Sequence, residues 1–237
     1  MNQRELTGYV ISRKRLRDSD LILTIYGMET GKIAVVAKGI KRPKAKLQSH
    51  VEPLIKTKFR IIGSWKLPVL VGARGLEENL YYTSNPEQNM AALLLTEIMD
   101  KITVEEMPNT NLFTAYSQAL KLMHSDEKFW LHLSFSILQI LKASGVEPQI
   151  TSSSQNKYYF NLSEGTIRSV AEGHESLLVP VDVVKLWKVC LQYNISTINR
   201  INADDKITRS SLDLLMSYIQ YYTHKKLKSA KVLFQSL

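Results

Sequence analysis

The chain has 237 residues, of which 44% are hydrophobic and 22% are charged. A single cysteine excludes an internal disulfide, and the small numbers of glycine and proline exclude a collagen-like or low-complexity chain. The apolar stretches are far shorter than the roughly 20 residues that cross a bilayer, and the N-terminus lacks the order of a signal peptide. We therefore expect no membrane association and a reduced, cytoplasmic setting.

The positive charge is concentrated in the first third of the chain. The formal net charge is +9. Residues 1–84 contain 16 Lys and Arg against 7 Asp and Glu, whereas residues 85–237 contain 15 of each kind. A focused positive potential attracts polyanions. This distribution favours nucleic acid as the partner, with a membrane surface second, and it favours nucleic acid over the alternative that the lysines only maintain solubility.

The same first third has the pattern of five short strands separated by Asp, Ser and Gly turns. The segments are residues 6–17, 21–26, 32–37, 52–62 and 67–73. Five strands in about 80 residues predict a small antiparallel barrel. The size fits an OB-fold, whose open face and loops bind single strands. The fold class is therefore α+β, with an OB-fold over residues 1–80 and a mostly helical domain over residues 81–237.

Two groups of cations in the predicted barrel are candidates for contacts to phosphates. Alternation in the first strand places Val10 inward and leaves a basic, exposed end with Arg13, Arg15 and Arg17. The loop after the third strand has five cations and no acid, which repel one another unless an anion binds: Lys38, Lys41, Arg42, Lys44 and Lys46. In contrast, we interpret the in-phase Lys56, Lys58 and Arg60 as a solvated outer face.

Four aromatic residues lie near these cations and could stack on bases. They are Tyr9, Tyr26, Phe59 and Trp65. Each also suits a barrel core, and Trp65, in a turn, is the one most suited to exposure.

Apolar residues at three- and four-residue spacing predict helices in the remaining two thirds. One helix begins at Pro86, a second follows Pro108, and a third begins near Asp126 and stops at Gly145, which together suggest a bundle. A small hairpin is expected near residues 157–168, followed by a helix from Pro180 and a long helix over residues 210–222. A basic tail then carries four lysines: Lys225, Lys226, Lys228 and Lys231. These lysines could stabilise the preceding helix end or recruit an anionic partner.

The sequence offers no catalytic or metal-binding motif. Neither glycine-rich phosphate motif is present, and the five histidines form no metal-ligand pattern. The closest carboxylate pairs, Asp18 with Asp20 and Asp204 with Asp205, lie among turn-forming residues. A Mg²⁺-dependent nuclease is therefore a minor alternative, and we expect no enzymatic activity, no cofactor and no metal.

Ordered motifs along the chain resemble the RecO family of bacterial recombination mediators. They are Gly8-Tyr9-Val10-Ile11, Asp18-Ser19-Asp20-Leu21, Thr30-Gly31-Lys32, Val36-Ala37-Lys38-Gly39 with Arg42-Pro43, and Tyr221-Tyr222-Thr223-His224 with the lysines that follow. The resemblance implies an N-terminal OB-fold, a helical domain and no enzymatic activity. It also implies binding to single- and double-stranded DNA and to the C-terminal tail of the single-strand binding protein SSB. Strand annealing, RecA loading with the partner RecR, and association with the nucleoid are further implications.

One departure from the family concerns zinc. Many members carry a four-cysteine motif roughly where residues 149–172 lie, but this segment has no cysteine. We therefore expect no zinc, as in other members that lack the motif. In the helical domain we expect an apolar groove for the acidic SSB tail, with Lys225, Lys226, Lys228 and Lys231 as candidates for its rim. The rival interpretation is an OB-fold protein that binds RNA in RNA or ribosome metabolism.

Overall fold

The chain packs as two units, Met1–Leu120 and Lys121–Leu237. The computed structural model describes residues 3–43, 45, 47–64, 66–76, 83–124, 128–151, 157–171, 173 and 175–235. The helices α1 and α2 group with the N-terminal barrel, not with α3. The three consecutive helices that were expected to form a bundle are therefore divided between the two units, and the domain bounds 1–80 and 81–237 remain a prediction.

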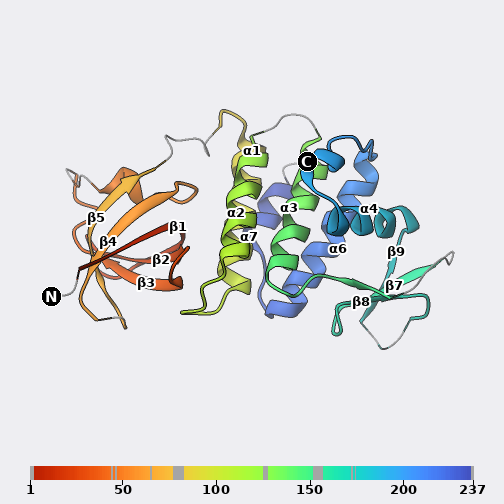
Figure 1. Cartoon of the computed structure of the whole chain (residues 1–237), viewed down its shortest axis with the longest axis horizontal. Helices are drawn as coiled ribbons and strands as arrows, with labels where there is room; N and C mark the ends of the chain where they lie inside the picture. The colour runs from red at the N-terminus through yellow and green to blue at the C-terminus, as the bar shows by residue number, and fades with distance from the viewer. Residues whose placement is uncertain are drawn as a thin grey trace. The chain divides into compact units, whose positions relative to one another are not determined.

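The first unit contains a closed barrel with the strand order β1-β2-β3-β5-β4 (Figure 1). Its strands are β1 (Gln3–Arg15), β2 (Leu21–Gly27), β3 (Gly31–Ala37), β4 (Thr57–Ile62) and β5 (Val69–Gly75), and a short 3-10 helix, η1 (Gln48–Val51), precedes β4. The long β1 pairs with β4 along its first half and with β2 along its second half. A parallel pairing of β3 with β5 closes the ring. The α+β class and the five-stranded OB-fold are confirmed.

Strand alternation sets the barrel core in β4 and in the part of β1 that precedes its bulge. In β4, Phe59 and Ile61 are buried, while Lys58 and Arg60 between and beside them are exposed. In β1, the pairing register shifts between Val10 and Ser12. Leu6 and Val10 belong to the barrel core, whereas Tyr9, the residue before Val10, is buried against α2. The sequence, interpreted with strict alternation, placed only Val10 inward.

The candidate stacking residues are core residues wherever the structure describes them. Tyr9 packs edge-on against Tyr116 of α2, with ring centroids 5.2 Å apart, and its hydroxyl lies 2.8 Å from Ser117 Oγ. Tyr26 and Phe59 are fully buried as well. Trp65 lies outside the described residues. The aromatic residues therefore fill the interior of the first unit and attach α2 to the barrel.

Two helices complete the first unit: α1 (Pro86–Ile102) and α2 (Thr110–Leu122). The side chain of Asn85 caps α1 by accepting bonds from two backbone N–H groups of its first turn. Lys32, at the start of β3, reaches α1 and lies 3.0 Å from Asp100 Oδ1. Gly31 has φ +67, and a side chain there would collide with the Met107 carbonyl. The β2–β3 hairpin thus lies directly against the α1–α2 connection.

The second unit combines helices with a four-stranded sheet of order β6-β8-β7-β9. Its helices are α3 (Phe129–Ala143), α4 (Val181–Gln192), α5 (Ile195–Ile198), α6 (Asp205–Thr223) and α7 (Lys228–Gln235). Its strands are β6 (Gln149–Ile150), β7 (Tyr158–Asn161), β8 (Thr166–Arg168) and β9 (Ser176–Val179). The hairpin predicted near residues 157–168 is present as β7 and β8. The basic tail, in contrast, leads into a helix that the sequence analysis did not predict, α7.

Aromatic packing joins the small sheet to the helices. Phe160 of β7 meets the fully buried Trp187 of α4 edge-on, with ring centroids 5.4 Å apart. The indole N–H of Trp187 donates to Ser211 Oγ of α6 over 2.7 Å. Cys190 is buried nearby on α4, and burial raises the pKa of its thiol to about 12. The thiol therefore stays protonated and acts as a core residue.

Two searches of the described residues concern metals and membranes. In the part of the chain that the structure describes, no three His, Cys, Asp or Glu side chains gather closely enough to hold a metal ion. Within the same residues, no helix combines the length and the apolar character needed to span a bilayer.

Candidate nucleic-acid interface

A hollow of about 310 Å³ lies at the end of the barrel where the predicted basic groups meet. Three of the predicted residues line it together: Arg13 and Arg15 from the end of β1, and Lys41 from the loop after β3. Gln48 and Glu52 add polar groups, and the apolar part of the wall consists of Leu21, Ile40 and Val51. The fold therefore brings two groups of cations that are separate in sequence to one site.

Two hydrogen bonds donated by backbone N–H groups of the basic loop hold the β1–β2 turn against that loop. Asp20 Oδ1 accepts a hydrogen bond from the backbone N–H of Gly39 over 2.7 Å. The N–H of Lys41 donates to the Ser19 carbonyl over 3.1 Å. Ile40 is buried between two exposed cations and anchors the loop in the barrel. The Asp18-Ser19-Asp20 turn thus positions the loop, which explains why its carboxylates lie among cations.

Acidic residues occupy part of this site. Arg13 Nη1 lies 2.6 Å from Glu52 Oε1, and Arg15 Nη2 lies 2.9 Å from Asp18 Oδ1. Both pairs are partly or largely exposed, so each contributes only about 0–1 kcal/mol to stability. An arriving phosphate can therefore replace either carboxylate at small cost.

The remaining predicted cations are exposed. Within the described residues, none of the following four forms an ion pair: Arg17, Lys38, Lys41 and Arg42. Lys44 and Lys46 lie outside the described residues. Exposed cations close to one another raise the local positive potential, which attracts a polyanion.

In the second unit, a larger groove of about 580 Å³ lies between α6 and α7. Three of the four lysines predicted as a rim line it, namely Lys226, Lys228 and Lys231, and Lys225 does not. The apolar lining comes from Met216, Leu227, Ala230 and Phe234. The basic tail therefore forms one wall of a groove with an apolar floor.

One acid, Asp213, belongs to the lining of this groove. Burial raises the pKa of its carboxyl, and the positive charge of Arg209 partly opposes this effect. The Arg209 guanidinium itself lies over the Trp130 ring, 4.6 Å from the ring centroid. Asp213 thus places an acidic side chain beside the lysine rim.

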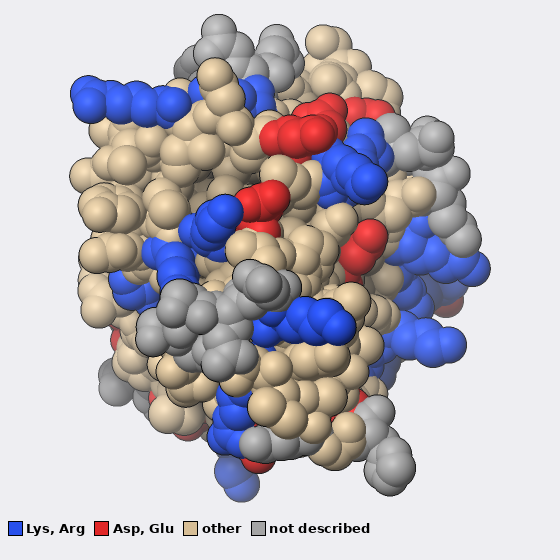
Figure 2. All heavy atoms as spheres, turned by 90° about the vertical axis from the view of Figure 1, so that its right-hand side faces the viewer, with Lys and Arg blue, Asp and Glu red and all other residues tan. Residues whose placement is uncertain are grey.

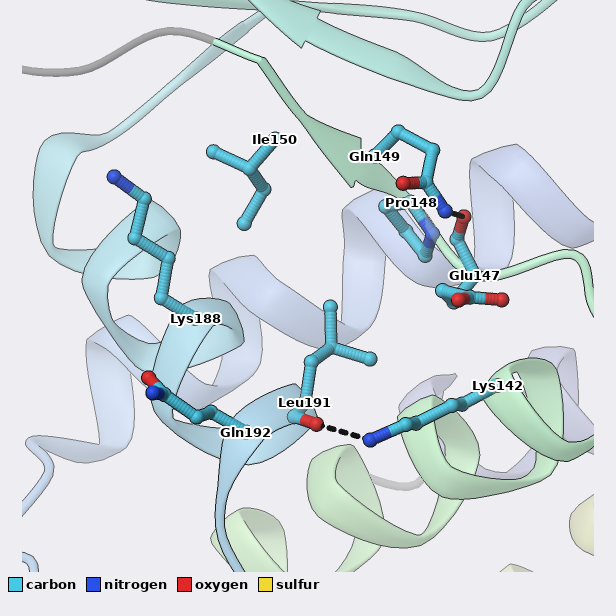
Figure 3. Close-up of a pocket in the computed structure, with 8 residues that line it drawn as sticks. All are labelled: Lys142, Glu147, Pro148, Gln149, Ile150, Lys188, Leu191 and Gln192. Atoms are coloured by element: carbon cyan, nitrogen blue, oxygen red, sulfur yellow. Dashed lines mark hydrogen bonds between the residues drawn. The ribbon is translucent and has the colours of Figure 1, made fainter.

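A second pocket of the helical unit, of about 320 Å³, was not predicted from the sequence (Figure 3). Lys142 of α3 reaches across it and donates to the Leu191 carbonyl at the end of α4 over 2.5 Å. Lys188 extends along the other side, and Pro148 and Ile150 contribute apolar surface. These residues are scattered along the sequence, so only the folded chain shows that they are neighbours.

The face of the molecule in Figure 2 contrasts with the hollow of the barrel. Most of this face is uncharged, and both Lys and Arg (blue) and Asp and Glu (red) are present, with more blue than red (Figure 2).

The closed five-stranded barrel and the helical unit with its small sheet place the chain among OB-barrel proteins with an added helical domain. Residues 1–75 match the family model described as "Recombination protein O N terminal", and residues 83–231 match "Recombination protein O C terminal". The chain belongs to the RecO family of DNA repair proteins.

Individual relatives agree with this membership. The chain is 25% identical to "DNA repair protein RecO" of Desulforamulus reducens, with 96% of this chain and 92% of the relative covered. It is 26% identical to the protein of that name from Alkaliphilus metalliredigens, with coverage of 91% and 92%. The corresponding Listeria monocytogenes protein is 24% identical, with coverage of 95% and 92%. The likeness therefore extends over both units.

Proposed function

We propose that this protein acts in DNA repair and homologous recombination as a DNA-binding mediator without enzymatic activity. The observation that carries the proposal is the hollow at the barrel end, where Arg13, Arg15 and Lys41 meet. Membership in a family of DNA repair proteins supports DNA as the polyanion. The ligands would be single- and double-stranded DNA, and the protein would work in the cytoplasm in association with the nucleoid.

The chemistry of this site is electrostatic. Cations at the hollow would neutralise phosphates and release counterions. If about five phosphates are neutralised on a single strand, the logarithm of the affinity falls with the logarithm of the salt concentration with a slope near −3.5. Neutralised strands repel one another less, so complementary strands can meet and anneal without a bond-making step. No cofactor is required for this activity.

The groove between α6 and α7 supports the second part of the proposal, binding of the SSB C-terminal tail. An acidic peptide that ends in apolar residues would place its carboxylates on Lys226, Lys228 and Lys231. Its apolar side chains would pack on Leu227 and Phe234. Recruitment to SSB-coated DNA would let the barrel act there. With RecR as partner, the protein would then promote RecA loading, as the family resemblance implies.

The experiment is a charge reversal of the loop, with Lys41, Arg42, Lys44 and Lys46 all changed to Glu. We expect about 10- to 100-fold weaker binding of a fluorescent oligonucleotide in moderate salt, because at least two phosphate contacts are lost. The matched control reverses Lys226, Lys228 and Lys231 and should weaken binding of an SSB-tail peptide while DNA affinity is kept. Unchanged DNA affinity of a folded loop variant would contradict the proposal.

RNA is the rival ligand, and the same assay distinguishes it. An OB-fold that reads the 2′-hydroxyl prefers RNA over DNA of equal sequence. The proposal expects no such preference, because the described cations of the hollow would meet phosphates. Annealing of SSB-coated complementary strands, with and without the protein, then tests the mediator role.

A further inference from the structure

A second basic surface lies on the outer face of the barrel, away from the hollow. Lys58 of β4 stands directly opposite Arg74 of β5, and Arg60 stands opposite Gly72 in the same register. All three cations are exposed. On the other side of β4, Glu5 of β1 pairs with Arg60 across the strands. Three cations and one acid thus share one sheet face.

The charges of this face are incompletely balanced. Glu5 Oε2 lies 2.7 Å from Lys58 Nζ, and Lys58, with help from Arg60, lowers the pKa of the Glu5 carboxyl. Among the described residues, neither Arg60 nor Arg74 forms an ion pair. Like charges directly opposite each other destabilise a sheet. The Lys58–Arg74 pair is therefore an arrangement that a bound anion would stabilise.

The position of Arg60 depends on a glycine. A Cβ atom at Gly72 would lie 2.7 Å from Arg60 Nε and 2.9 Å from Arg60 Nη2, so the guanidinium lies directly over the Gly72 backbone. The pairing register of β4 with β5 shifts next to it, between Arg60 and Ile61. Such bulges redirect side chains. The local backbone thus accommodates the guanidinium on the outer face.

This face is separate from the hollow on the same strand. β1 pairs with β4 from Gln3 to Gly8, and with β2 from Gly8 to Arg15. Glu5 and Arg13, which mark the two surfaces, are therefore separated by about 26 Å of extended strand. A single phosphate group cannot contact both surfaces.

We propose that the outer face of β1, β4 and β5 is a second phosphate-binding surface that holds a second DNA strand while the first occupies the hollow. The inference rests on the proposed function. Charge complementarity favours a phosphate backbone over an acidic protein, because Lys58 and Arg60 project from the sheet face about 7 Å apart along β4, with Arg74 opposite Lys58 on β5. Two strands on one barrel would be held close enough to search for complementarity.

The test uses the full-length Arg60→Gln/Arg74→Gln variant, which removes two positive charges from this face and leaves the Lys58–Glu5 bond intact. The control, Lys185→Gln/Lys206→Gln, removes the same charge from exposed positions of the second unit. Binding of two non-complementary oligonucleotides with different dyes is measured at low salt, together with the annealing rate of complementary strands. Thermal unfolding checks the fold of each variant.

We expect the wild-type protein and the control to bind both oligonucleotides at once. The Arg60/Arg74 variant should bind the first with an affinity within about twofold of wild type, lose the second, and anneal at least about fivefold more slowly. Retention of the second oligonucleotide, or equal weakening of both, overturns the proposal. Displacement of the second strand by polyglutamate as readily as by DNA overturns the choice of DNA.

The loop reversal described above keeps the two proposals distinguishable. If the loop variant loses the first strand and the Arg60/Arg74 variant retains both, only the second surface fails. If the loop variant binds the first strand with the affinity of wild type, the proposal that the hollow binds DNA is wrong, irrespective of the result for the outer face.

Discussion

The two units carry similar surplus charge in different surroundings. Residues 1–120 contain 17 Lys and Arg against 12 Asp and Glu, and residues 121–237 contain 14 against 10. In the first unit the cations line a hollow whose other charged and polar groups are Glu52 and Gln48, whereas in the second they edge an apolar groove. The setting of a charge, more than its amount, thus indicates the partner.

The acids of α1 sharpen this contrast within the first unit. Asp100 of α1 pairs with Lys32 at the start of β3, whereas the basic loop follows the opposite end of that strand. Asp100 thus contacts the barrel away from the hollow. It does not reduce the positive charge of the residues that line the hollow.

The largest expected effect comes from disrupting one core at a time. Trp187→Ala and Phe59→Ala each remove a fully buried aromatic ring, and each should cost about 3–5 kcal/mol of unfolding free energy. Trp187 contacts Phe160 and Ser211 of the second unit, and Phe59 belongs to the barrel core of the first. Trp187→Ala should therefore weaken SSB-tail binding and preserve DNA affinity, and Phe59→Ala should weaken DNA binding and preserve SSB-tail affinity.

Thermal unfolding, an oligonucleotide-binding assay and a peptide-binding assay measure these effects. Loss of both binding activities in either variant would contradict the assignment of one activity to each unit.

A smaller effect distinguishes two acids of the hollow. Glu52→Gln should raise DNA affinity about two- to fivefold, because it releases Arg13 from a carboxylate that competes with phosphate. Asp20→Ala should lower the affinity by a similar factor, although it also removes a negative charge, because it removes the acceptor for the Gly39 N–H.

The control for this pair is Asp20→Asn, which keeps an acceptor oxygen and should not lose affinity. Oligonucleotide titrations of the three variants suffice. An increase in affinity for Asp20→Ala would show that Asp20 acts only through its charge.

The smallest effect concerns Asp213 in the α6–α7 groove. Because burial raises the folded-state pKa of this carboxyl, its ionised form costs stability, and that stability is regained as the pH falls through the folded-state pKa. Asp213→Asn should therefore slightly stabilise the protein at neutral pH and bind an SSB-tail peptide about twofold more tightly. Its peptide affinity should also change less on acidification than that of wild type. Weaker peptide binding by Asp213→Asn would show that the negative charge of Asp213 does not oppose binding of the acidic peptide.

The elements with a regular pattern could be predicted from the sequence. In β4 the alternating Phe59 and Ile61 are apolar, and the strand forms over the second half of the predicted range 52–62; in α1 a proline follows the capping Asn85, and the helix begins where expected. The bulge in β1 could not be predicted, because it depends on pairing with β2. β6 and β9 are too short to show a periodic pattern. The lysines of the basic tail did not indicate a helix, so α7 was not predicted, although Leu227, Ala230 and Leu233 in or next to it are buried.

The cations of the candidate site could be predicted from the sequence, but the acidic residues beside them could not. The loop after β3 and the end of β1 stand out in the sequence as basic segments. Glu52 lies far from Arg13 in the sequence, and only barrel closure brings the two side chains within 2.6 Å. The role of Asp20 also needs the fold, because its bond to Gly39 connects two turns.

The most direct measurement of the central claim is the salt dependence of single-stranded DNA binding, for wild type and for Lys41→Glu/Arg42→Glu. Wild type should show a log–log slope near −3.5, and the variant should show a slope shallower by about 1.4, since each lost phosphate contact contributes about 0.7. Equal slopes for the two proteins would show that this loop does not contact the DNA backbone.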